Sequence, residues 1–127
     1  MAEKRPELSD AEWVVMKAVW RLKKTNVREV YEDLTHSHNW AYNTVRTMME
    51  RLREKGYLSA KKIGNTFFYQ PRVSQRKISM GALERFADKV FNGAIGPIVA
   101  HLIQQDKLSD AEVEEIKRLL EEEEGES

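Results

Sequence analysis

Apolar residues recur at helical spacing near the start of the chain. Trp13, Met16 and Trp20 are three and four positions apart, which places them on one face of a helix. Ser9 and Glu12, at the beginning of this stripe, have the spacing of a capping box, in which each side chain bonds the other residue's backbone amide. The pattern predicts a first helix that begins next to Ser9.

A second apolar stripe predicts another helix, which begins at Thr25 or Asn26 and ends near Thr35. The polar residues 36–39 after it are typical of a turn. The apolar positions of this helix are Val27, Val30, Tyr31 and Leu34.

The middle of the chain changes from helical to strand-like spacing. A third helix is expected over residues 41–55, with Gly56 as a left-handed stop. Two strand-like runs then flank Gly64 and Asn65, and this pair between such runs favours a tight hairpin turn. The runs cover residues 58–63 and 66–70, and the expected buried face of the helix carries Tyr42, Val45, Met49 and Leu52.

The opposite face of the third helix is polar and cationic. The side chains that cluster there, at about 100° per residue, are Asn43, Arg46, Thr47 and Glu50. A cationic helix followed by a basic hairpin is the arrangement of a recognition helix and a wing, which together read duplex DNA. We therefore predict a mainly α fold with a small β-hairpin, in which residues 1–72 form a winged helix-turn-helix DNA-binding domain.

Residues 73–127 are expected to form a helical dimerisation domain of three helices. The first ends at Asn92 and Gly93, the second has Pro97 in its first turn, and the third follows a second Leu-Ser-Asp-Ala-Glu segment at 108–112. About 50 residues alone are too few to enclose such wide apolar stripes. Packing against the N-terminal domain can cover part of this area, and a two-fold related second copy covers it more naturally. The residues expected in this homodimer interface are Leu83, Phe86, Val90, Phe91, Ile98, Val99, Leu102, Ile103, Val113, Ile116, Leu119 and Leu120.

The net charge of zero conceals an uneven distribution. Residues 1–72 contain 14 Lys and Arg against 9 Asp and Glu, whereas residues 73–127 contain 7 against 12. A basic half favours a polyanionic partner, although surface charge can also segregate without a function. The chain has no cysteine, which excludes disulfides and thiolate metal sites and fits a reducing compartment. No apolar run approaches the roughly 20 residues that span a bilayer, so we expect a cytoplasmic protein without direct membrane insertion.

Several short motifs occur in a specific order along the chain. They are residues 8–13 with Met16 and Trp20, residues 44–47 followed by Arg51 and Leu52, residues 55–58, and Phe67 with Tyr69 in the second strand. In this order and spacing they resemble the penicillinase-repressor family of bacterial winged-helix regulators, the BlaI/MecI/CopY group. The resemblance covers essentially the whole chain.

This resemblance implies a dimeric repressor that binds an inverted repeat of operator DNA, with the third helix in the major groove and the wing on the backbone. In the best-known members, a membrane-embedded sensor protease detects a β-lactam and cleavage of the repressor weakens the dimer, so such a protease is an implied partner. Where that family has its cleaved Asn-Phe bond, this chain has His101-Leu102. A different protease preference or another signal is therefore expected. Copper-responsive members carry a C-terminal cysteine cluster, which this chain lacks.

Arg46 is the strongest candidate for reading a base, because its planar guanidinium can bond guanine O6 and N7 together. Thr44 and Thr47 can meet a base edge, a phosphate or a thymine methyl, and Asn43 can bond adenine. Each of these residues has a simpler alternative role as solvated helix surface. Glu50 is expected to pair with Arg46 or Arg53, or to mark where the helix leaves the groove. The candidates for contact with the DNA backbone are Tyr42, Arg51, Arg53, Lys55, Lys61, Lys62 and Arg72.

The main alternative function is a protein-interaction module, because winged helices also serve as docking domains. The cationic face around Arg46 and the dimer-like C-terminal helices argue against it. The sequence shows no nucleophile-base pair and no phosphate-binding glycine loop, so we expect no enzymatic activity and no cofactor. His36 and His38 lack a neighbouring carboxylate cluster and are expected to be solvated and not to bind a metal.

Overall fold

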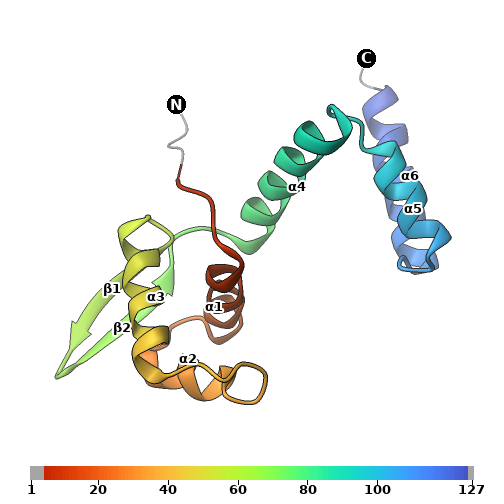
Figure 1. Cartoon of the computed structure of the whole chain (residues 1–127). Helices are drawn as coiled ribbons and strands as arrows, with labels where there is room; N and C mark the ends of the chain where they lie inside the picture. The colour runs from red at the N-terminus through yellow and green to blue at the C-terminus, as the bar shows by residue number, and fades with distance from the viewer. Residues whose placement is uncertain (1–4, 126–127) are drawn as a thin grey trace. The chain divides into compact units, whose positions relative to one another are not determined.

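The computed structural model describes the backbone of residues 5–125 and the side chains of residues 5–118. The chain divides into two compact units, one up to Ser79 and one from Met80 onward. The described residues form a mainly helical fold with one two-stranded hairpin, as predicted (Figure 1). In chain order the elements are α1 (Asp10–Leu22), α2 (Val27–Leu34), α3 (Tyr42–Glu54), β1 (Leu58–Ile63), β2 (Thr66–Pro71), α4 (Gln75–Phe91), α5 (Gly96–Gln104) and α6 (Asp110–Gly125).

The helix starts of the first unit are fixed by side-chain caps. Ser9 and Glu12 form the predicted capping box, because the Ser9 amide donates to Glu12 Oε1 (2.8 Å) and the Glu12 amide donates to Ser9 Oγ (3.2 Å). For α2, the cap is Asn26, whose Oδ1 accepts a hydrogen bond from the Glu29 amide at 2.9 Å. Thr25 therefore lies outside the helix, and its backbone pairs with β2 instead.

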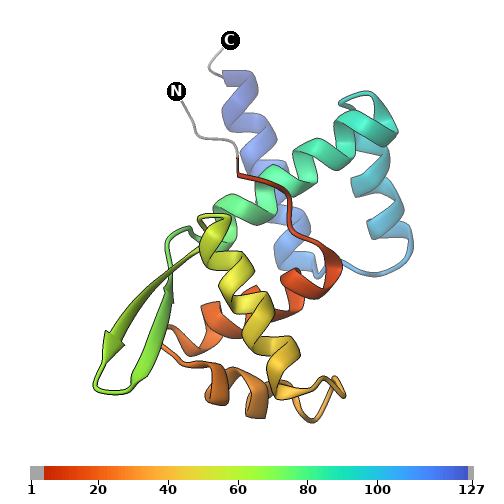
Figure 2. The same cartoon turned by 60° about the vertical axis from the view of Figure 1, so that its left-hand side comes forward.

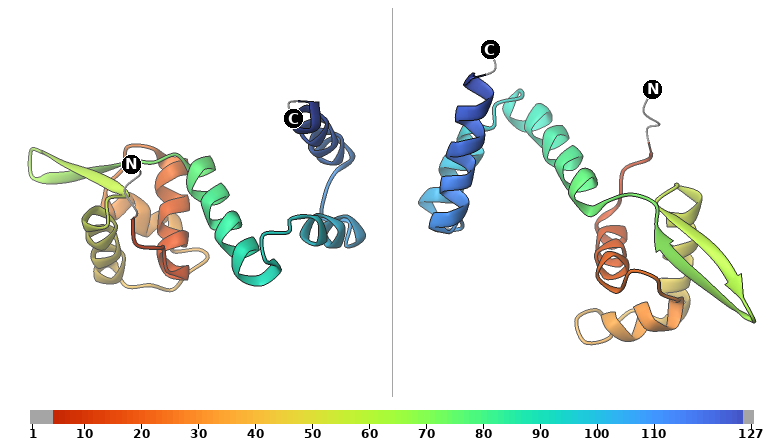
Figure 3. Two further views of the ribbon diagram at one scale, coloured as in Figure 1. Left: turned by 90° about the horizontal axis from the view of Figure 1, so that it is seen from above. Right: turned by 180° about the vertical axis from the view of Figure 1, so that it is seen from behind.

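The hairpin is antiparallel and projects away from the helices of the first unit (Figure 2). Gly64 turns the chain between β1 and β2 with a φ of 65°, a left-handed value that glycine adopts at little cost. Thr25 joins the base of this sheet, since its amide donates to Tyr69 O (2.9 Å) and the Tyr69 amide donates to Thr25 O (2.7 Å). The hairpin is thus tied at its base to the α1–α2 connection, while its tip protrudes (Figure 3).

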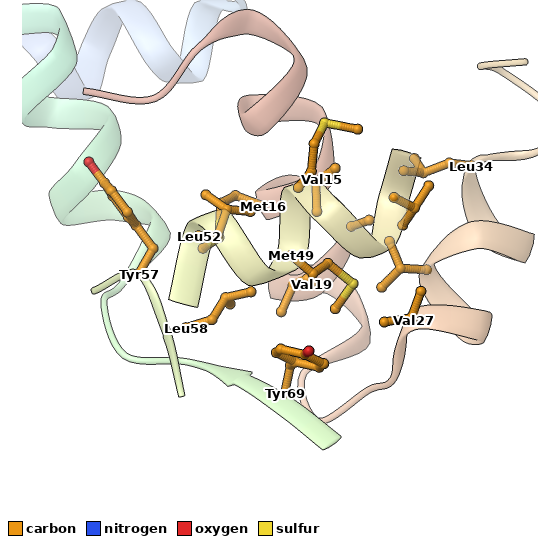
Figure 4. Close-up of a cluster of buried hydrophobic side chains, with 14 residues drawn as sticks. Val15, Met16, Val19, Val27, Leu34, Met49, Leu52, Tyr57, Leu58 and Tyr69 are labelled. Atoms are coloured by element: carbon orange, nitrogen blue, oxygen red, sulfur yellow. The ribbon is translucent and has the colours of Figure 1, made fainter. Parts of the chain in front are cut away.

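The buried core of the first unit joins α1, α2, α3 and the base of the hairpin (Figure 4). Val45, Met49 and Leu52 occupy the buried face of α3, as predicted, and Met48 joins them. Tyr42 was also predicted on this face, and that prediction is wrong because 38% of its surface is exposed. Tyr42 starts α3 at the margin of the core, where its ring and that of Tyr31 form a T-shaped pair with 5.7 Å between ring centroids. The remaining core residues include Val15, Met16, Val19, Val30, Leu58 and Tyr69.

The second unit contains most of α4 together with α5 and α6. Asn92 and Gly93 end α4 with positive φ angles of 53° and 86°, as the sequence predicted. Pro97 lies in the first turn of α5, and Ser109 and Glu112 repeat the reciprocal capping contacts of α1 before α6. Large apolar side chains remain exposed on α4 and α5 and in the connection between them: Met80, Leu83, Phe86, Val90, Ile95 and Ile103.

In the part of the chain that the structure describes, no helix combines the length and the apolar character that crossing a membrane requires.

Candidate nucleic-acid interface

The solvent-facing side of α3 carries all four predicted base-reading residues. The buried positions of this helix recur every three or four residues, so the intervening positions point outward. Each of the four side chains is exposed, and none of them belongs to the buried core. They are Asn43, Thr44, Arg46 and Thr47. The helix therefore presents short polar groups and one guanidinium on a single face, which suits a major groove.

A cleft lies between the N-terminal halves of α2 and α3 and the hairpin. Tyr42 and Arg46 line this cleft from α3, and Asn65 and Phe67 line it from the hairpin. The cleft brings the predicted recognition helix and the predicted wing to one surface. Phe67 is 52% exposed there, so an aromatic ring stands among the polar groups of the wing.

Arg28 also belongs to this surface, although the sequence pattern around it did not indicate this. Its guanidinium carbon lies 5.6 Å from the centroid of the Tyr42 ring, within the range of a cation–π contact. Its side chain lies 3.8 Å from Glu32 one turn further along α2, and both are exposed. Spacing along α2 could not reveal the contact with Tyr42, because it joins residues on two different helices.

Glu50 is the centre of a hydrogen-bonded cluster between α3 and the wing. Its Oε1 accepts a hydrogen bond from Arg53 Nη2 (2.9 Å), and its Oε2 accepts one from the Tyr69 hydroxyl (2.6 Å). The expected pairing of Glu50 with Arg46 or Arg53 is therefore realised with Arg53. A second cleft is lined by Glu50, Arg53 and Tyr69 together with Arg46, Ala60 and Phe67.

The charge states of this cluster follow from its contacts. The hydrogen bonds from Arg53 and then Tyr69 hold the pKa of Glu50 below its usual value of 4.5, so the carboxylate is ionised at neutral pH. Burial, followed by the hydrogen bond to Glu50, raises the pKa of Tyr69 to about 12. Tyr69 therefore keeps its proton and acts as a donor.

The two adjacent wing lysines lie on opposite faces of the hairpin. Lys62 is paired across the strands with Phe67, and Lys61 with Phe68, and successive residues of a strand point to opposite sides. Lys62 Nζ lies 5.9 Å from the Phe67 ring centroid, on the side that faces the cleft. On the other side, Lys24 Nζ lies 5.9 Å from the Phe68 ring centroid. Both faces of the wing are therefore cationic.

Lys55 occupies a different environment from the other candidates for backbone contact. Its ammonium donates to Glu12 Oε1 (2.6 Å) and to the Glu7 carbonyl (3.2 Å), and its side chain is only 21% exposed. This ion pair joins the end of α3 to the start of α1. Arg51 and Arg72, by contrast, are exposed. We therefore keep Arg51 and Arg72 as candidates for phosphate contact and assign Lys55 a role in the fold.

The predicted dimerisation and cleavage residues lie on α4, α5 and α6. Phe86 and Val90 are 49% and 52% exposed, and the rings of Phe86 and Phe91 form a T-shaped pair with 5.9 Å between their centroids. His101 is exposed and Leu102 half-buried in α5. Leu83 and Ile103 are exposed, whereas Ile98, Val99, Val113 and Ile116 are half-buried. The predictions for Leu119 and Leu120 fall outside the described side chains.

Comparisons with known proteins find relatives that match this chain over most of its length. The model of the penicillinase repressor family matches residues 8–122. The penicillinase repressor of Bacillus licheniformis is 33% identical over 120 residues, which is 94% of each chain. The methicillin resistance regulatory protein MecI of Mammaliicoccus sciuri is 31% identical over 120 residues, covering 94% of this chain and 98% of that protein. The solution structure of monomeric Bacillus licheniformis BlaI in complex with the blaP half-operator is 38% identical, with a TM-score of 0.51 over 58% of this chain and 90% of that chain.

Proposed function

The chain belongs to the penicillinase repressor family, and from this premise we propose that it is a dimeric repressor that occupies a palindromic operator. One observation carries the proposal: Arg46, on the exposed polar face of α3, and Phe67, on the wing, both line the two clefts between α3 and the hairpin. A similar protein, monomeric BlaI, was solved in complex with a half-operator. A repressor that acts by occupying its operator catalyses no reaction and needs only affinity for DNA and a sequence preference.

In this proposal α3 reads the bases. Arg46 bonds a guanine edge with its guanidinium, and Thr47, Thr44 and Asn43 contribute shorter contacts to neighbouring bases. All four side chains are exposed, so none has to leave a packed position to reach the groove. A bidentate contact of this kind discriminates against the wrong base by about 1–3 kcal/mol.

Contacts with the phosphate backbone set the register of the protein on the duplex. We assign them to Tyr42 at the start of α3 and to four cations of α3, of the wing and of its end: Arg51, Lys61, Lys62 and Arg72. Arg53 is left out because its guanidinium is hydrogen-bonded to Glu50. Phosphate contacts hold the protein in place without reading sequence. They also make the affinity fall as the salt concentration rises.

The second unit supplies the dimer in this proposal. The exposed apolar side chains of α4 and α5 leave a surface that a second copy covers through an isologous contact. Two copies then present two α3 helices, which matches the symmetry of an inverted repeat. Relief of repression by proteolysis at His101-Leu102 fits the same arrangement, because a cut in α5 separates α6 from α4.

The proposed function is tested by fluorescence anisotropy with the promoter of the gene itself and a scrambled duplex, across a salt series. We expect palindrome-dependent binding by two chains per site, with an affinity that falls steeply as salt increases. Arg46→Ala should reduce the free-energy preference for the operator over the scrambled duplex by about 1–3 kcal/mol. Folding and dimerisation should remain intact, because the side chain is exposed.

The control is Lys17→Ala, which removes an exposed cation from α1 and should leave the sequence preference unchanged. Unchanged operator preference in Arg46→Ala would refute the base-reading role. Weak binding of the wild type without any sequence preference would instead favour the second candidate, a winged-helix module that docks on protein.

A further inference from the structure

The carboxylate of Glu50 lies on a surface that otherwise suits phosphate. It is four residues after Arg46 and three before Arg53, and residues at these separations are neighbours on a helix. The three side chains line one cleft with the wing residues Phe67 and Tyr69. A negative charge at this position repels the DNA backbone, so its presence requires a physical account.

The contacts of Glu50 show what the carboxylate holds in place. Arg53 Nη2 donates to Oε1 at 2.9 Å and Arg53 Nε approaches the same oxygen at 3.3 Å, so the guanidinium is directed toward Glu50. The Tyr69 hydroxyl donates to Oε2 at 2.6 Å, which links α3 to β2. The charge of Arg46 also contributes to the low pKa of Glu50, so Arg46 lies within electrostatic reach of the carboxylate.

On these grounds, and building on the proposed function, we infer that Glu50 determines the specificity of DNA binding by withholding guanidinium charge from phosphates. On a duplex without the operator sequence, Arg53 and Arg46 would gain most from phosphate contacts, and the competing carboxylate reduces that gain. On the operator, Arg46 has a base edge to bind, and the loss is smaller. Glu50 therefore lowers non-operator affinity more than operator affinity, which is a repulsive contribution to specificity.

Glu50→Gln is the informative substitution, because the amide keeps the shape of the side chain and can still accept the Tyr69 hydrogen bond. We expect its affinity for scrambled duplex to rise roughly three- to tenfold and its salt slope there to steepen by about one unit, as one further phosphate is neutralised. Operator affinity should change less than twofold, so the ratio between the two duplexes falls. Glu50→Asp keeps the charge and should retain weak binding to scrambled duplex.

The matched control is Glu54→Gln, which makes the same change of net charge one turn further along α3, outside the cleft that Glu50 lines. Equal increases in Glu50→Gln and Glu54→Gln would overturn the inference in favour of a general effect of net charge. A loss of operator affinity with no change on scrambled duplex would overturn it too, since Glu50 would then be accepting a hydrogen bond from a base. If the wild type itself prefers no operator, the proposed function and this inference fail together. If the wild type prefers the operator and Glu50→Gln leaves the ratio of operator to scrambled-duplex affinity unchanged, only the inference fails.

Discussion

The ion pair between Lys55 and Glu12 offers a quantitative test of what holds the first unit together. Glu12 is 1% exposed, and its Oε1 accepts hydrogen bonds from Lys55 Nζ (2.6 Å) and the Ser9 amide (2.8 Å), while Oε2 has no hydrogen-bond partner. Lys55→Met keeps most of the aliphatic stem and removes the charge. We predict that this variant loses about 3 kcal/mol of unfolding free energy at pH 7.

Two considerations give this magnitude. Removing one partner of a buried ion pair typically costs about 3–5 kcal/mol, because the remaining charge is left without compensation. The part of this cost that comes from the unpaired buried charge has an upper limit, because Glu12 can take up a proton instead. Protonating a carboxyl group whose usual pKa is 4.5 costs ~3.4 kcal/mol at pH 7, at about 1.36 kcal/mol per pH unit. The lower end of the first range and the second limit agree.

The sign of the pH dependence provides a second check. Burial opposes ionisation of Glu12, but the contacts with Lys55 and Ser9 outweigh it and lower the pKa. Because the folded pKa lies below the unfolded value, wild-type Glu12 contributes stability above about pH 4.5 that is lost as the pH falls through the folded pKa. Without Lys55, burial dominates and the folded pKa rises. The variant then loses stability as the pH rises above 4.5, so the difference between the two proteins should shrink toward acid.

The assay is urea unfolding of the full chain, followed by tryptophan fluorescence at several pH values. All three tryptophans precede Ser79, so the signal reports the first unit. Lys17→Met is the control, because Lys17 is exposed on the same α1 helix, and it should change stability by less than about 0.5 kcal/mol. A loss for Lys55→Met no larger than that of the control, or a loss independent of pH, would refute the argument.

Two further predictions concern the proposed DNA and dimer contacts. Lys61→Ala and Lys62→Ala should each weaken binding to all duplexes by a similar factor and lower the salt slope by about one unit. The two effects should be additive, because the side chains lie on opposite faces of the wing. A sequence-selective loss of affinity in either variant would contradict phosphate contact. Phe86→Ser should leave the first unit folded but weaken self-association by roughly 10- to 100-fold, measured by sedimentation, as expected for an aromatic side chain at the centre of an interface. An unchanged association constant would exclude this part of α4 from the dimer.

Features governed by local chemistry were predictable from the sequence. The capping box at Ser9 and the hairpin turn at Gly64 each depend on a few adjacent residues, and the structure has both where they were expected. Helical spacing alone also placed Arg46 on the exposed side of α3. The predicted burial of Tyr42 was wrong, because spacing gives the direction of a side chain but not where the core ends along the helix.

Contacts between distant segments could not be read from spacing. Lys55 had the position of a phosphate contact after the recognition helix, and its partner Glu12 lies 43 residues earlier. The sequence limited the partner of Glu50 to Arg46 or Arg53, but Tyr69, 19 residues away, appears only when the hairpin folds back on α3. In each case the missing information was the packing of two elements against each other.

The large exposed hydrophobic side chains are unevenly divided between the two units. The described residues include nine large exposed hydrophobic side chains, of which six lie from Met80 onward. The other three, Tyr42, Ile63 and Phe67, lie at the start of α3 and on the wing, within or beside the proposed DNA surface. The core of the first unit is formed by its own buried apolar residues. If a second copy covers the six residues of the other unit, association changes operator affinity by pairing two half-sites and leaves each α3 surface unaltered. A signal that acts on α4 or α5 can therefore release DNA without touching Arg46.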